Sequence, residues 1–410
     1  MQARRIRYES GTKGEIMKLL LNNGALMYDP LSIKGSVKAK TIRNAIDEMQ
    51  KAGLVEKHLS EMGQYITITN EEMINRYCCR YKRNGMWDSY VVDEELLKHW
   101  KERSREDAMQ IVKYQKVLKR DTNYRSLKRI NDIARREYLK AEAKQVMYLS
   151  DVITLVNEDK GKEIEKGVFY DGLEVKADTS YRVLTKDEIE DVMVANSRAV
   201  GNLISLGGTY TIYNTGKNLL RWNALLSEES FNNACRNIAK ERHGIIADKR
   251  QAIILGHKFK PLVSLIERND RTEEGRKANK IMESFYDDIF YIPIGEAGGK
   301  VLTLMQQDYW FDIMKEYLIP QDYDTEPLHI GRGADGMKAD NVILLFTAGN
   351  VKQLEVFEQR AILNPNSKFT LKSFSFMKDA LEKVTWPNNV SLEYEDIDEY
   401  MELLRQEGLL

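Results

Sequence analysis

The stretch "VKAKTIRNAIDEMQKAGLVEK" (residues 37–57) decides how the first part of the chain folds. Ile42, Ile46 and Met49 recur at the spacing of one helix face. Gly53 follows as a helix stop, because glycine tolerates the left-handed backbone that ends many helices. The stretch therefore predicts an amphipathic helix that opens with lysines, ends at the glycine and leads into the short strand "LVEKH".

The flanking sequence completes a small domain. "KGEIMKLLLNNGALM" (13–27) has the apolar spacing of another short amphipathic helix, and Pro30 and Gly35 break the chain after it. "YITIT" (65–69) is aromatic and β-branched, so with "LVEKH" it predicts a hairpin. Helix, turn, helix and a two-stranded wing is the order of a winged helix-turn-helix domain, which we expect over residues 1–75.

In such a domain the second helix of the motif enters the major groove of duplex DNA. Lysines neutralise phosphates, while arginine and asparagine hydrogen-bond base edges. The residues predicted to contact DNA are Lys38, Lys40, Thr41, Arg43 and Asn44 on the helix, with Lys57, His58 and Gln64 in the wing. The same pattern would also suit a plain capped surface helix, or a winged helix that binds protein.

Charge is unevenly distributed along a chain whose net charge is only −1. Residues 98–144 carry fifteen Lys/Arg against seven Asp/Glu, whereas residues 379–410 carry nine acids against two bases. "CCRYKRNGMWD" (78–88) is expected to connect, and extended helices follow because Pro and Gly are absent over 87–145. Residues 76–145 are therefore predicted as a basic helical connector, either tracking a nucleic-acid backbone or serving as a solvated spacer or dimerisation arm.

From residue 146 to 410 short β-like runs alternate with helical ones. This alternation predicts an α/β layered domain with a mainly central sheet. The predicted strands are 209–214, 250–256, 287–294, 341–348, 368–376 and 390–395; the predicted helices are 217–244, 260–268, 301–318, 350–362 and 397–406.

Composition limits the class of protein. No window approaches eighteen uninterrupted apolar residues, so no membrane span is expected. The start "MQARRIRYES" lacks the apolar stretch of a secretory signal, and Cys78, Cys79 and Cys235 cannot form a disulfide framework. A cytoplasmic protein is the expectation.

"GVFYDGLEVK" (167–176) and "SRAVGNLISLGGTYTIYNTGKNLLRWNALLSEE" (197–229) resemble the replication-relaxation family of Gram-positive mobile elements. Members join an N-terminal winged helix to a nuclease-like α/β domain and are associated with plasmid replication or conjugative transfer. The resemblance therefore implies a nuclease-like domain over 146–410. The residues that carry it are Tyr213, Asn214, Gly216, Trp222 and Glu229.

The "YNTG" turn (213–216) also has a physical interpretation. Asn214 and Gly216 tolerate left-handed backbone, and Thr215 or Asn218 would cap the following helix. A helix N-terminus there would suit a phosphate, although a purely structural turn is the plainer interpretation.

Catalytic residues stay unknown, and no cofactor or metal is expected. Glu174 and Lys176 form an E-x-K fragment, with Asp171 or Asp159 as a partner for Mg²⁺, but such fragments are common in a chain with 30% charged residues. The five histidines are dispersed along the sequence, which argues against the histidine triad of a metal-dependent relaxase. They are His58, His99, His243, His257 and His329. "GEAGGK" (295–300) and "HIGRGADGMKADN" (329–341) lack the P-loop pattern and are predicted as loops at strand ends.

The sequence thus predicts a DNA-binding protein of a plasmid or conjugative element that acts in replication or transfer initiation. The alternative is a winged-helix transcription regulator whose C-terminal domain senses a ligand or partner. The expected partner is double-stranded DNA; other replication or transfer proteins and a homo-oligomer stay open. Whether the chain is an enzyme also stays open.

Overall fold

The chain divides into two compact units, Met1–Leu149 and Ser150–Leu410, described separately below. No helix among the described residues combines the length and apolarity needed to cross a bilayer. The computed structural model describes residues 11–14, 16, 20, 25–28, 38–59, 63–68, 79–83, 87–92, 138–153, 166–171, 175, 197–216, 225–257, 285–326, 333–338 and 341–410.

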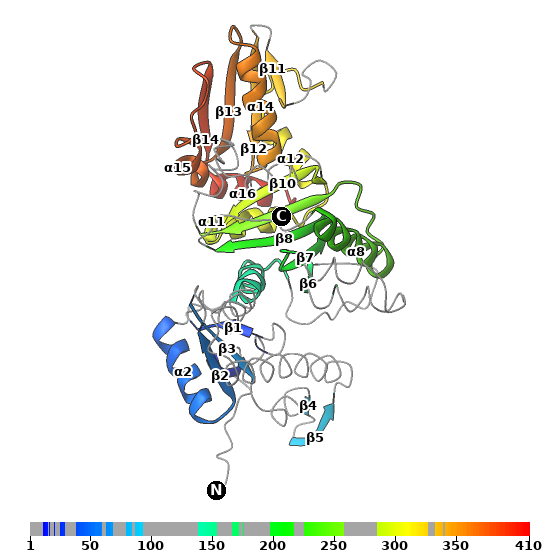
Figure 1. The fold of residues 1–410 in the computed structure, drawn as a ribbon, viewed down its shortest axis with the longest axis vertical. Coiled ribbons are helices and arrows are strands. Elements are labelled where there is room, and N and C mark those ends of the chain that lie inside the picture. Colours follow the sequence, from blue (N-terminus) through cyan, green and yellow to red (C-terminus); the bar gives the residue numbers. More distant parts are fainter. Residues whose placement is uncertain are drawn as a thin grey trace, which may run out of the picture. The chain divides into compact units, whose positions relative to one another are not determined.

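The N-terminal unit contains a three-stranded antiparallel sheet with helix α2 beside it (Figure 1). Its elements are β1 (Ala25–Met27), α2 (Ala39–Lys51), β2 (Val55–Leu59) and β3 (Gln64–Ile68). The strands lie in the order β1–β3–β2, and β2 and β3 confirm the predicted hairpin.

The predicted helix over 13–27 is wrong at its end. Helical backbone occurs at residues 12–14, 16 and 20, but Ala25–Met27 form a strand. The reason is tertiary: these three residues pair with Tyr65–Thr67 of β3, and that ladder overrides a helical pattern.

Helix α2 confirms the prediction from the opening stretch. Its buried side consists of Ile42, Ala45, Ile46 and Met49, which recur at helical spacing. The chain leaves the helix through Gly53, whose φ of 72° is left-handed.

The expected connector contains a strand pair. β4 (Cys79–Arg83) and β5 (Trp87–Val92) form an antiparallel two-stranded ladder, so this part is not a simple connection. Residues 138–149 are helical, and Ala141 and Tyr138 pack against Tyr65 of β3. The helices predicted between β5 and residue 138 lie outside the described residues.

The C-terminal unit has two larger sheets where the sequence predicted one central sheet. The first has the order β10–β9–β8–β7–β6, with β6–β7–β8 antiparallel and β8–β9–β10 parallel. Its strands are β6 (Val168–Asp171), β7 (Gly201–Ser205), β8 (Gly208–Gly216), β9 (Gln251–Gly256) and β10 (Asp288–Pro293).

The second sheet has the order β11–β12–β13–β14, parallel except for β11. Its strands are β11 (Gly336–Lys338), β12 (Val342–Thr347), β13 (Lys368–Phe374) and β14 (Val390–Glu395). The helices of the unit are α8 (Leu225–His243), α11 (Glu296–Leu304), α12 (Trp310–Leu318), α14 (Val351–Leu363), α15 (Lys378–Leu381) and α16 (Ile397–Gln406).

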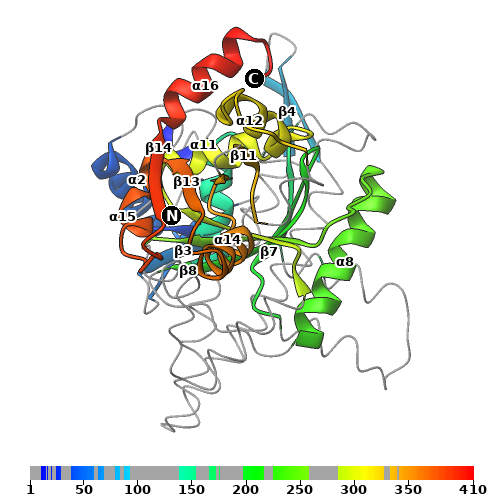
Figure 2. The same ribbon diagram turned by 90° about the horizontal axis from the view of Figure 1, so that it is seen from above.

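Helices cover both faces of the first sheet. On one face α8 packs at the β6–β7 side, where Phe231 and Cys235 meet Ile204, and α14 packs at the β10 side. Seen from above, α8 and α14 are separate helices, with α8 at the right of the view and α14 near its centre (Figure 2). On the other face the Trp310 ring of α12 lies 5.4 Å from the Phe290 ring of β10.

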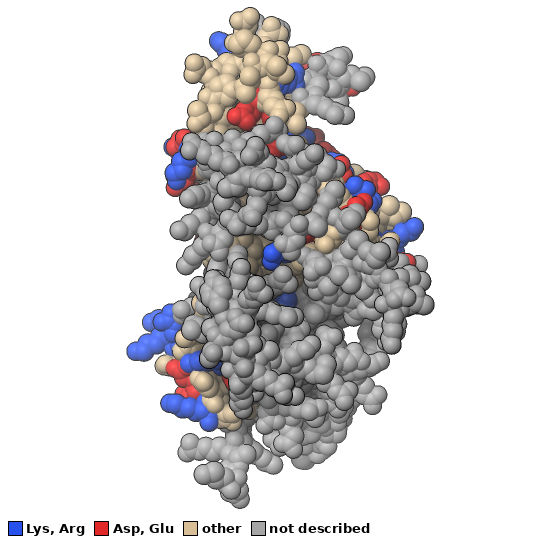
Figure 3. Space-filling view, viewed as in Figure 1, with Lys and Arg blue, Asp and Glu red and all other residues tan. Residues whose placement is uncertain are grey.

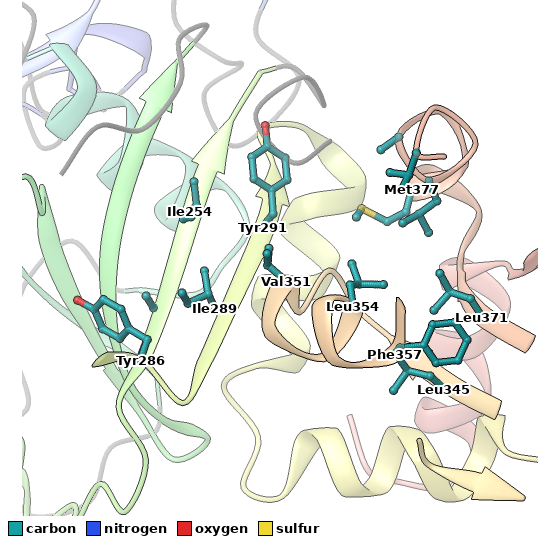
Figure 4. Packing of buried hydrophobic residues seen from close by; sticks show 14 of the residues in the cluster. Ile254, Tyr286, Ile289, Tyr291, Leu345, Val351, Leu354, Phe357, Leu371 and Met377 are labelled. Carbon is teal, nitrogen blue, oxygen red and sulfur yellow. The ribbon is translucent and has the colours of Figure 1, made fainter. Parts of the chain in front are cut away.

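Helix α14 joins the two sheets. Figure 4 shows its buried side between Ile254 and Tyr291 of the first sheet and Leu345 and Leu371 of the second. The backbone continues the connection, because Tyr291 N donates to Gly349 O at 2.9 Å, just before α14 begins. Both sheets therefore share one apolar interior.

The helix predicted over 301–318 is two helices, α11 and α12, because Tyr309 takes a left-handed φ of 52° between them. "GEAGGK" is not a loop, since residues from Glu296 onward belong to α11. A Cβ at Gly298 would meet Pro293 O at 1.8 Å, so the glycine lets α11 approach the end of β10.

Candidate nucleic-acid interface

The first half of α2 presents a row of polar residues to solvent. All five helix residues predicted to contact DNA are exposed: Lys38, Lys40, Thr41, Arg43 and Asn44. They are exposed because the apolar residues between them face the sheet. In Figure 3, Lys and Arg side chains project from the part of the N-terminal unit that α2 forms.

The first half of α2 carries basic residues and no acidic residue. Its first turn has no acidic residue, so Lys38 and Lys40 add to the positive end of the helix dipole. The acids, Asp47 and Glu48, come later on the helix and form ion pairs with Lys57 of β2 and Lys13, respectively. Both acids therefore lie in the second half of α2, together with Lys51, and the charged residues of the first half are all basic.

The Asp47 carboxylate is held in its charged form. A hydrogen bond from Lys57 lowers the pKa of Asp47 below its ordinary value, and Tyr28 adds a hydrogen bond of 3.0 Å. The Lys57 ammonium also lies over the Tyr28 ring, 4.0 Å from its centroid. Lys57, predicted to contact DNA, thus neutralises α2's own acid.

The other two predicted wing residues differ from each other. His58 is half-buried: its Nε2 lies 2.8 Å from Thr67 Oγ1, and its ring stacks on Tyr65. Burial lowers the pKa of His58, which favours the neutral ring. Gln64, at the start of β3, is exposed. Of the predicted wing residues, Gln64 is the one placed to reach a ligand.

Tyr213, from the family-like motif, belongs to a buried polar cluster in the C-terminal unit. Its hydroxyl donates to Glu228 Oε2 at 2.6 Å and lies 2.6 Å from the Tyr286 hydroxyl. Ser197 Oγ donates to the same Glu228 oxygen at 2.7 Å, and Arg198 N donates to Oε1 at 2.9 Å. These residues are called the Glu228 cluster below.

Burial shifts the pKa values of the acidic groups in the Glu228 cluster. Burial raises the pKa of Glu228, although the hydrogen bonds from Tyr213, Arg198 and Ser197 oppose that shift. Burial likewise raises the pKa of Tyr213 and of Tyr286, so both phenols stay neutral. Because Glu228 is 0% exposed, the cluster fastens the first turn of α8 to the sheet and offers no direct access to a substrate.

The motif residue predicted from the sequence was Glu229, but the acid that hydrogen-bonds Tyr213 is its neighbour, Glu228. Glu229 is half-buried, whereas Glu228 makes the contacts to Tyr213. Helical spacing could have identified Glu228 as an inward-facing residue. It lies three residues before Phe231 and seven before Cys235, so the three share one face of α8. Ser197 and Tyr286 had no such local signal. Trp222 lies outside the described residues.

The "YNTG" residues (213–216) were predicted as a turn, but they form the last part of β8, the middle strand of the first sheet. Asn214 Oδ1 accepts from Gly216 N at 2.9 Å, and Gly216 has a left-handed φ of 57°. Thr215 Oγ1 donates to Leu255 O of β9 at 3.0 Å, so this hydroxyl binds the sheet. Asn218, the other predicted cap, is not among the described residues.

The residues weighed for metal chemistry are mostly outside the described part. Asp171 ends β6, while Asp159, Glu174 and Lys176 are not described. Within the described ranges no group of three or more His, Cys, Asp or Glu is arranged to hold a metal ion. Of the dispersed histidines, His243 is buried with its Nε2 2.8 Å from the Tyr170 hydroxyl.

Comparison with known proteins adds no relative. No protein-family model, no curated protein and no solved structure matches this chain. The similarity to the replication-relaxation family therefore stays a prediction from the motif residues.

Proposed function

We propose that the N-terminal unit is a winged helix that binds duplex DNA through the first half of α2. One observation carries the proposal: Lys38, Lys40 and Arg43 are exposed on a helix end whose only acids are paired farther along. The strand order β1–β3–β2 beside α2 supports it, since this is the arrangement expected of a winged helix.

The proposed contacts divide by chemistry. Lys38 and Lys40 neutralise phosphates and supply most of the salt-dependent affinity. Arg43 and Asn44, about one helical turn later, present bidentate donors and acceptors to base edges. Gln64, exposed at the start of β3, contacts the flanking groove or backbone.

Charge reversal tests this proposal. In Lys40→Glu/Arg43→Glu, duplex affinity falls by about one hundredfold at low salt, since two phosphate-facing cations become anions. The salt dependence of Lys40→Ala alone flattens by about one charge unit. The matched control is Lys51→Glu/Lys368→Glu, which changes the net charge equally at exposed positions on the far end of α2 and on β13. Equal losses in both double variants would show that overall charge, and not this helix end, binds DNA.

The proposed setting is replication or transfer initiation on a plasmid or conjugative element, and it rests on the resemblance of residues 167–176 and 197–229. Nuclease protection across the host element tests it. Protection at the replication or transfer origin is the expected result. Protection confined to a promoter would replace this setting with transcription regulation.

A further inference from the structure

Three buried polar side chains between α8 and the first sheet carry atoms that have no hydrogen-bond partner among the described residues. They are Asn202 of β7, Thr209 of β8 and Asn232 of α8, and each is at most 1% exposed. Within the described part of the chain, Asn202 Oδ1 and Nδ2, Thr209 Oγ1 and Asn232 Oδ1 have no hydrogen-bond partner. Four such atoms in one region call for an explanation.

The three side chains lie on the same side of the sheet as Thr211. Asn202 pairs directly with Thr211 across the β7–β8 ladder, so both side chains project from the same face of the sheet. Thr209 lies two residues before Thr211 on β8 and shares that face. Asn232 reaches down from α8, and its Nδ2 donates to Thr211 Oγ1 at 3.0 Å. The unpaired atoms therefore lie in one layer between the sheet and the helix.

These buried atoms need a partner, and the described residues do not supply one. A domain's net stability equals the worth of only a handful of hydrogen bonds, so four unmade bonds in one interior would consume most of it. Glu228 is not the partner, because its oxygens accept from Ser197, Tyr213 and Arg198.

The chemistry of the atoms selects the ligand. Asn202 presents an unpaired donor and an unpaired acceptor, Asn232 presents an unpaired acceptor, and the Thr209 hydroxyl can both donate and accept. A cation would face the Asn202 Nδ2 donor, and an anion would face the amide oxygens. Water donates and accepts equally, and buried waters typically make about three hydrogen bonds to such groups.

We propose that ordered water binds between β7, β8 and α8, held by Asn202, Thr209 and Asn232. The site lies beside the Glu228 cluster, since Thr211 also hydrogen-bonds Tyr286. Bound water thus extends the polar row from Glu228 through Tyr213, Tyr286 and Thr211 to Asn202. This row fastens two turns of α8 to β7 and β8.

Thr209→Val distinguishes a hydrated site from a dry one by the sign of its effect. If water is bound, the valine removes one of its partners, and the melting temperature falls by about 2–4 °C. If the site is dry, the same substitution removes an unpaired hydroxyl, and the melting temperature rises. Thr347→Val calibrates the size of a loss, because Thr347 is equally buried and its Oγ1 accepts from Gly349 N and Asn350 N.

A crystal structure of the full chain at about 1.5 Å resolution provides the direct measurement. Electron density within hydrogen-bonding distance of Asn202 Nδ2 or Oδ1 and of Asn232 Oδ1 is the expected result. Density there supports the proposal. It also decides between a hydrated and a dry site if the change in melting temperature of Thr209→Val is small. An empty site, or a raised melting temperature in Thr209→Val without such density, overturns it.

Discussion

Helices α2 and α8 are both amphipathic, but they treat their polar residues in opposite ways. The buried side of α2 is entirely apolar, and its charged residues face solvent or pair at the surface. Helix α8 buries Glu228 and Asn232 beside Phe231 and Cys235. The comparison shows that helical spacing identifies which residues face inward. The spacing does not tell whether those residues are held by apolar packing or by hydrogen bonds.

The first way to test this comparison is to remove packing from α2. Ile46→Ala deletes buried methyl groups from a residue that is 0% exposed, and we expect a loss of about 2–5 kcal/mol in the stability of the N-terminal unit. Hydrogen exchange of the α2 amides measures the loss. Asn44→Ala, at an exposed position two residues earlier, is the control and should leave protection nearly unchanged. Equal protection in both variants would contradict the packing described for α2.

The second test removes the polar anchor of α8. Glu228→Ala leaves the hydroxyls of Ser197 and Tyr213 and the N–H of Arg198 without their acceptor, at a cost of about 2–3 kcal/mol. Chemical denaturation of the C-terminal unit measures it. Glu229→Ala, on the adjacent half-buried acid, should cost less than about 0.5 kcal/mol. A larger loss in Glu229→Ala than in Glu228→Ala would show that the wrong acid has been placed in the cluster.

The smallest expected effect concerns how stability depends on pH. Asp47 of α2 and Glu228 of α8 should change the stability in opposite directions. The pKa of Asp47 lies below its ordinary 3.8, so its contribution is present above pH 3.8 and is lost as the pH falls through the folded-state pKa. The pKa of Glu228 lies above its ordinary 4.5, so its contribution is present below pH 4.5 and is lost as the pH rises through the folded-state pKa. The contributions therefore change with pH in opposite directions.

Neutral variants isolate each acid. From about pH 3 to pH 7, the melting temperature of the wild type should rise relative to Asp47→Asn and fall relative to Glu228→Gln. Differential scanning calorimetry on the three proteins gives both comparisons. The contrast between the helices fails if the two differences drift in the same direction.

Much of the fold could be predicted from local pattern. The closing helix is confirmed at its predicted bounds, Ile397–Gln406, because its apolar spacing is bracketed by the capping Asp396 and by Gly408. The β4–β5 ladder was missed, although Asn84–Gly85 between two β-rich runs is a strong hairpin signal. The split into two sheets had no local signal, since strand pairing depends on residues far apart in the chain.

The candidate sites divide in the same way. Exposure of the polar residues of α2 followed from one helical period within one stretch of sequence. The Glu228 cluster assembles Ser197, Tyr213, Glu228 and Tyr286, which are separated by up to 89 residues (from 197 to 286) and lie on different elements. Patterns in a single sequence report neighbours along one helix or strand. They therefore identified the exposed polar residues of α2, but only one member of the Glu228 cluster, Tyr213.

The position of α14 limits how the protein can be divided. Val351 fills space against the first sheet, and Leu354 and Phe357 fill space toward the second. A chain that ended near residue 340 would keep all five strands of the first sheet and still expose the apolar surface that α14 covers. Such a fragment would be prone to aggregate, so domain trimming for expression should keep residues 150–410 together.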